Sequence, residues 1–94
     1  MRPVSVVRIP PVLRSEAGGA RQVEADGATL RELIENLSAQ LPALGARIYG
    51  EGELHSFVNV YVDGEDVRLR SGLETPVRAD TTVILLPAMA GGGG

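Results

Sequence analysis

The residues with the clearest chemical use are four consecutive glycines at the end of the chain. Gly91, Gly92, Gly93 and Gly94 follow the small residue Ala90. Before them, an apolar run with strand propensity, residues 82–86, stops at Pro87. Ordering glycine costs more conformational entropy than ordering any other residue, so a folded domain has no structural need for such an end. A segment without Cβ atoms can thread through a narrow channel and present its carboxylate to an activating enzyme.

The absence of several residue types limits the reactions and the metal sites that the chain can support. The chain of 94 residues has no cysteine, which removes disulfides, thiolate metal sites and a nucleophilic thiol. Its single histidine, His55, cannot make a zinc site by itself. All nine basic residues are arginine. This fits a GC-rich genome, a need to keep amines away from an activated acyl group, or both. We therefore expect no metal site and no catalytic side chain.

Charge and hydropathy exclude two classes of partner. The formal net charge is −3, and acidic and basic residues are mixed along the chain without the basic stripe that nucleic acids require. The first residues lack the apolar region of a secretion signal, and no apolar run reaches the length of a membrane span. We expect a cytoplasmic protein that binds neither nucleic acid nor membrane. With 44% hydrophobic residues but only 3% aromatic ones, the chain should form one small domain with an aliphatic core.

One amphipathic helix is predicted to lie against that core. Thr29 and Glu32 have the spacing of a capping box, in which the hydroxyl accepts from the amide three residues on and the carboxylate reaches back. The apolar residues that follow have the spacing of one helical stripe: Leu30, Leu33, Ile34, Leu37 and Leu41. Pro42 should end this helix, and residues 42–48 could form a second short turn of helix.

Five segments are predicted to be β-strands, because they are rich in β-branched residues or alternate: residues 4–9, 20–25, 57–62, 65–69 and 82–86. Residues 12–14, 49–53 and 73–77 are expected to be connectors or loops. The order β-β-α-β-β-β lets the first and last strands pair in parallel at the centre of one sheet.

This order indicates an α+β fold of the ubiquitin-like β-grasp type, a mixed β-sheet with one main helix across one face. We expect the domain to span residues 1–88. Residues 89–94 are then a flexible glycine-rich C-terminal tail that leaves from the central strand.

Strand alternation predicts a docking surface. Val58, Val60 and Val62 lie on one face of their strand. If this face meets the helix, four apolar residues lie on the uncovered side: Phe57, Tyr61, Ile84 and Leu86. Such a patch is typical of a docking site, here for the activating enzyme while the tail enters its active site. The alternative is that residues 42–56 cover part of it.

An acidic cluster after the third long strand has an ordinary explanation. Asp63, Glu65 and Asp66 resemble calcium ligands, but they flank a tight two-residue turn and not the longer loop of a calcium site. We expect a solvated turn in which Arg68 and Arg70 pair with neighbouring acidic residues.

Several stretches together resemble one known family. They are Asn59 within its strand, residues 63–68, residues 73–77, and the end of the chain at residues 86–92, which reads Leu-Pro-Ala-Met-Ala-Gly-Gly. This pattern is similar to the prokaryotic ubiquitin-like sulfur carriers of the MoaD/ThiS superfamily, and residues 54–62 resemble the CysO branch most closely. The resemblance covers nearly the whole chain.

The resemblance implies a carrier that is a co-substrate and not an enzyme, with no bound cofactor. An E1-like partner of the MoeB, ThiF or MoeZ type would use ATP to adenylate the terminal glycine, and sulfur from a persulfide would give a thiocarboxylate. In the CysO branch a PLP-dependent cysteine synthase accepts the sulfur, and a JAMM-type metalloprotease releases the product. Other relatives supply sulfur to other synthases. Ala90, Gly91 and Gly93 would then belong to the tail that enters partner active sites.

The end of the chain departs from the family pattern. The family usually ends at the second glycine, which makes Gly92 the positional equivalent, while Gly94 ends the chain as written. Three origins of Gly93 and Gly94 are open: they are native and activated, they are removed by trimming, or they were added by cloning.

Two rival functions are also open. They are a ubiquitin-like modifier joined to lysines of other proteins, and the small subunit of a molybdopterin-synthase-type complex.

Overall fold

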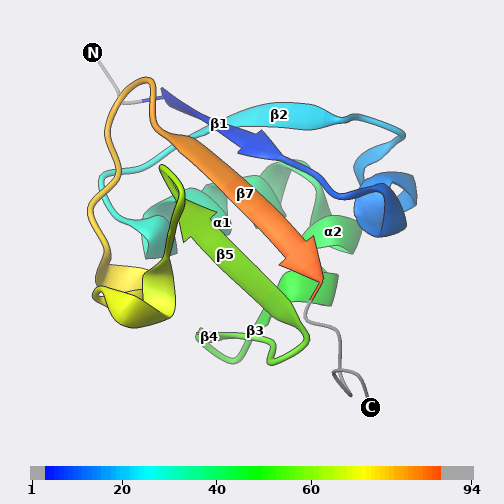
Figure 1. Ribbon diagram of the computed structural model, residues 1–94. Helices are drawn as coiled ribbons and strands as arrows, with labels where there is room; N and C mark the ends of the chain where they lie inside the picture. Colours follow the sequence, from blue (N-terminus) through cyan, green and yellow to red (C-terminus); the bar gives the residue numbers. More distant parts are fainter. Residues whose placement is uncertain (1–3, 88–94) are drawn as a thin grey trace.

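A five-stranded mixed β-sheet organises the computed structural model, which describes residues 4–87 (Figure 1). Its strands, in spatial order, are β2 (Gln22–Asp26), β1 (Val4–Arg8), β7 (Thr82–Pro87), β5 (Val58–Val62) and β6 (Glu65–Asp66). β1 and β7 pair in parallel at the centre, and all other pairs are antiparallel. The predicted parallel pairing of the first and last strands is confirmed.

Helix α1 (Leu30–Gln40) begins as the capping box predicts. Thr29 Oγ1 accepts a hydrogen bond from the Glu32 amide at 3.3 Å, and Glu32 Oε1 accepts from the Ala28 amide at 2.9 Å. The predicted stripe faces inward, since four of its members are fully buried and Leu41 is half-buried against the core: Leu30, Leu33, Ile34 and Leu37. Burial of this stripe stabilises the helix far more than its intrinsic propensity does.

Residues 42–48 form a second helix, α2 (Pro42–Ile48), with proline in the first turn where no amide partner is needed. It crosses α1 closely because Gly45 has no side chain. A Cβ atom at Gly45 would lie 2.7 Å from the Cα of Ser38 on α1. In Figure 1 both helices lie behind the sheet, so they cover one face and leave the other open.

The valine face of β5 packs under these helices. Val58, Val60 and Val62 are at most 6% exposed, and Val83 and Leu85 of β7 are fully buried beside them. The core is therefore aliphatic, and the β-grasp arrangement predicted from the element order is confirmed. Within residues 4–87 no helix is long and apolar enough to cross a membrane.

Two connectors carry more regular structure than predicted. The expected connector at 12–14 is part of a 3-10 helix, η1 (Pro11–Ala17), which ends at Gly18 with φ 67°. The expected loop at 49–53 contains a small hairpin, β3 (Tyr49–Gly50) and β4 (Glu53–Leu54). Glu51 and Gly52 between them have φ of 54° and 78°, the conformation of a tight hairpin turn.

The predicted strand at 65–69 is wrong beyond Asp66. Asp66 Oδ1 accepts a hydrogen bond from the Arg68 amide at 2.9 Å, and the chain turns there into a 3-10 helix, η2 (Val67–Leu69). A second 3-10 helix, η3 (Gly72–Glu74), follows. Aspartate competes for nearby amides in this way and ends the strand after two residues.

Candidate functional site at the end of the central strand

Strand β7 is the anchor from which the predicted tail continues. It is hydrogen-bonded to β1 on one side and β5 on the other, and Pro87 stands opposite Val58 at its end. Its start is fixed by Asp63, whose amide donates to the Thr82 carbonyl at 2.9 Å and whose Oδ1 accepts from the Thr82 amide at 3.0 Å. With two neighbours and two buried side chains, this strand cannot slip by one residue without exposing its core face.

The predicted tail itself lies outside the described residues. The positions concerned are Ala90, Gly91, Gly92, Gly93 and Gly94. The described part of the site is thus the surface around Pro87.

Three of the four predicted docking residues lie together on the open face of the sheet. Tyr61 stands opposite Ile84 across the β5–β7 pair, and Leu86 stands opposite Asn59 one step nearer the end of the strand. Tyr61 and Ile84 are half-buried, and Leu86 is 41% exposed. None of these is on the face that α1 and α2 cover, so the open side presents an apolar strip that runs toward the end of β7.

Phe57 lies elsewhere, because β5 begins only at Val58 and residue 57 belongs to the turn before it. Its ring stacks on His55, with centroids 5.6 Å apart and planes 10° from parallel. The guanidinium carbon of Arg47, from α2, lies 6.0 Å from the Phe57 centroid. The ring also borders a hollow of about 110 Å³ whose other walls include Val12 and Pro87. Strand alternation grouped Phe57 with Tyr61, but Phe57 flanks the end of β7 from the helical side.

Sequence reasoning missed three arginines that surround the open end of β7. Arg8, Arg14 and Arg21 line a groove together with Ile84 and Leu86. One signal was present in the sequence, since Arg8 occupies an outward position of its predicted strand. Arg14 and Arg21 lie in and beside connectors, and only the fold brings them to the same place.

The acidic turn carries the two ion pairs that were predicted. Arg68 pairs with Asp66 at 2.8 Å, and Arg70 pairs with Glu65 at 3.2 Å. The side-chain hydrogen bond from Arg68 lowers the pKa of Asp66 below its ordinary value. Among residues 4–87 no three His, Cys, Asp or Glu side chains gather as a metal site would require.

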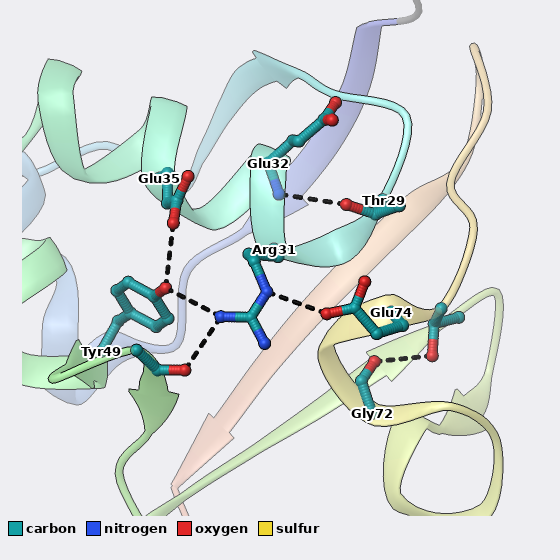
Figure 2. A network of polar contacts seen from close by, with 9 residues as sticks. Thr29, Arg31, Glu32, Glu35, Tyr49, Gly72 and Glu74 are labelled. Carbon is teal, nitrogen blue, oxygen red and sulfur yellow. Dashed lines mark hydrogen bonds and ion pairs between the residues drawn. The ribbon is translucent and has the colours of Figure 1, made fainter.

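A polar clip holds the hairpin that precedes Phe57 (Figure 2). Arg31 of α1 donates from Nε to Glu74 Oε2 at 2.9 Å and from Nη1 to the Gly52 carbonyl at 3.0 Å. Tyr49, which lies 3.4 Å from the same guanidinium, donates to Glu35 at 3.1 Å. The clip joins α1, the β3–β4 hairpin and η3, and its role is structural.

Comparison with known proteins places this architecture in a family. The sequence profile of the ThiS family matches residues 7–92, which is most of the chain. The chain belongs to the ThiS family.

Similar proteins include known sulfur carriers of this kind. Sulfur carrier protein CysO of Mycobacterium tuberculosis (strain ATCC 25618 / H37Rv) is 43% identical over 89 residues, covering 92% of this chain and 96% of that protein. A putative sulfur carrier protein of Archaeoglobus fulgidus is 35% identical over 88 residues, with coverage of 92% and 96%. A chain in the crystal structure of the Amycolatopsis orientalis BexX/CysO complex superposes with a TM-score of 0.85 at 45% identity, covering 93% of this chain and 98% of that one. The structural neighbour shares the ubiquitin-like β-grasp fold with this chain.

Proposed function

We propose that this chain is a sulfur carrier whose terminal glycine is adenylated and then converted to a thiocarboxylate. The observation that carries the proposal is the position of β7. The strand is paired on both sides and buried at Val83 and Leu85, and the Ala-Met-Ala-Gly sequence begins directly after Pro87. The identity to CysO over nearly the whole chain supports the same role.

In this chemistry the chain supplies a folded domain and a terminal carboxylate, and its partners supply the catalytic groups. A carboxylate is a poor electrophile, so an E1-like enzyme would join it to AMP from ATP and release pyrophosphate. Hydrosulfide can then displace AMP directly. A persulfide sulfur forms an acyl disulfide instead, and a second thiol of the partner cleaves it to leave the thiocarboxylate. The carrier contributes no catalytic side chain to these steps and is not an enzyme.

The match to the family profile supports Gly92 as the activated residue, because the matched region ends there. Gly94 is the activated residue if the sequence is used untrimmed. Further partners in the proposal are a PLP-dependent synthase that accepts the sulfur and a JAMM-type metalloprotease that releases the product.

The docking surface for the activating enzyme is proposed to be the open-face strip of Tyr61, Ile84 and Leu86, with Phe57 beside the end of β7. The test is the adenylation KM of Leu86→Arg and Phe57→Ala. A higher KM for Leu86→Arg is expected because a charge would replace an exposed apolar contact. Unchanged KM values for both variants would remove this surface from the proposal.

The function is tested by intact-mass analysis after incubation with ATP, an activating enzyme and a sulfide source. The expected product is heavier by about 16 Da, since sulfur replaces one oxygen of the terminal carboxylate. Matched chains ending at Gly92, Gly94 and Ala90 identify the active terminus, and the chain ending at Ala90 should stay unmodified. No mass gain for either glycine terminus would refute the carrier function.

Two rival functions give different products. A protein modifier would appear as a ladder of conjugates on other proteins in cell extracts. A synthase subunit would co-purify in a stable complex with a large catalytic subunit. A carrier should give only free protein and its thiocarboxylate.

A further inference from the structure

A groove of about 630 Å³ opens on the uncovered face of the sheet beside the end of β7. Its walls include Arg8, Arg14, Arg21, Gln22, Ile84 and Leu86. Three of its lining residues are arginines and none is acidic. The strand register explains the juxtaposition, because Arg8 of β1 stands between Gln22 of β2 and Ile84 of β7.

The arginines of this groove are largely uncompensated. Four arginines elsewhere lie within 4.0 Å of a carboxylate oxygen: Arg31, Arg47, Arg68 and Arg70. Arg8 and Arg21 form no such pair within residues 4–87, and both are exposed. Arg14 donates from Nε to the Ile9 carbonyl oxygen at 3.1 Å, and within residues 4–87 its guanidinium forms no ion pair with a carboxylate. A chain of net charge −3 therefore concentrates free positive charge at one place.

We propose that this groove binds an acidic segment of the activating enzyme. Carboxylates of that segment would pair with Arg8, Arg14 and Arg21, and an apolar side chain would rest on Ile84 and Leu86. Guanidinium groups suit this task because they bind carboxylates in a planar, two-point geometry. The inference rests on the proposed function and adds the chemistry of the partner surface.

The position of the groove favours the activating enzyme as its occupant. Leu86 lines the groove, and the next residue, Pro87, ends β7. Gly92 and Gly94 follow Pro87 by five and seven residues, so an activated carboxylate at either glycine lies at most roughly 18–25 Å from Pro87 when the chain is fully extended. A partner held in the groove therefore keeps the terminal carboxylate within that distance of its anchor, close to the centre where adenylation would occur.

The test measures ATP–pyrophosphate exchange by a purified activating enzyme, with the carrier as the varied substrate. The main variant is Arg8→Gln combined with Arg21→Gln. Both side chains are exposed and form no ion pair within residues 4–87, so the substitutions should leave the fold intact. Arg78→Gln is the matched control. Arg78 is also exposed, its side chain has no acidic partner among residues 4–87, and it does not line the groove. Thermal unfolding of all variants checks that the fold is retained.

The double variant should raise the carrier's KM by roughly 3–20-fold, with kcat unchanged, as expected for loss of two exposed charge contacts. Arg78→Gln should leave KM unchanged. The KM of the unaltered carrier should rise as salt increases from about 0.05 M to about 0.5 M, and that of the double variant should rise less. Replacing both arginines by glutamate should raise KM further.

Equal KM values for the double variant and the Arg78→Gln control would overturn the groove assignment, as would equal salt dependence. This failure differs from failure of the proposed function. If the unaltered carrier forms a thiocarboxylate but the groove substitutions leave KM unchanged, the proposed binding of an acidic segment is wrong and the carrier function is unaffected. If no thiocarboxylate forms, the carrier function itself is wrong.

Discussion

Substitutions at two neighbouring leucines of β7 should affect different properties, the stability of the fold in one case and docking in the other. Leu85 is fully buried under the helices, and Leu86 is 41% exposed on the other face. Leu85→Ala should lower the free energy of unfolding by about 2–5 kcal/mol, through lost burial and the cavity that remains. Leu86→Ala should cost about 1 kcal/mol or less, because much of that side chain is already in water. In a domain of this size the first change should lower Tm by at least about 10 °C.

The assay pairs thermal unfolding with adenylation kinetics, measured well below both Tm values. Leu85→Ala should have a normal KM, since the folded molecules that remain present the same open face. Leu86→Ala should raise KM by roughly 3–10-fold, through loss of an apolar contact, and leave most of the stability intact. A stable Leu85→Ala with a raised KM, or an unstable Leu86→Ala with a normal one, would refute the assignment of the two faces.

Three further changes test the fold around this strand. Gly45→Ala should destabilise the protein by about 1–3 kcal/mol, because the new methyl group meets the backbone of Ser38. Denaturant unfolding measures this. Thr29→Ala should cost about 1 kcal/mol in the same assay through loss of the helix cap. Arg68→Gln should raise the pKa of Asp66 towards its ordinary value in a carboxyl NMR titration, because its lowered pKa comes from that hydrogen bond. A carboxylate with a lowered pKa stabilises the fold above its unfolded pKa, so this contribution should disappear as pH falls through the lowered value in the native protein and be absent in the variant.

The local elements could be predicted from the sequence because each has a strong local cause. Thr29 and Glu32 set the start of α1, and the leucine stripe sets the face it buries. Strict alternation at Val58, Val60 and Val62 was enough to predict which side of β5 meets the helices. The order of these elements then predicted a central β7, and the glycines after it suggested the chemistry. The inferences about α1 and β5 depend on residues within one helix or one strand.

The side chains around the end of β7 could not be predicted, because they come from segments that are distant in the sequence. Phe57 left the open face because the strand starts one residue later than alternation implies, and its partners come from the hairpin and from α2. Arg8 lies in β1, Arg14 in η1 and Arg21 just before β2, so no single strand or helix pattern groups them. They meet because η1 folds the first connector back beside β1 and β2. The local patterns in the sequence were enough to predict the β-grasp body and its central strand. The side chains that surround the end of β7 could not be predicted from those patterns, because side-chain proximity across a sheet depends on register and connector geometry.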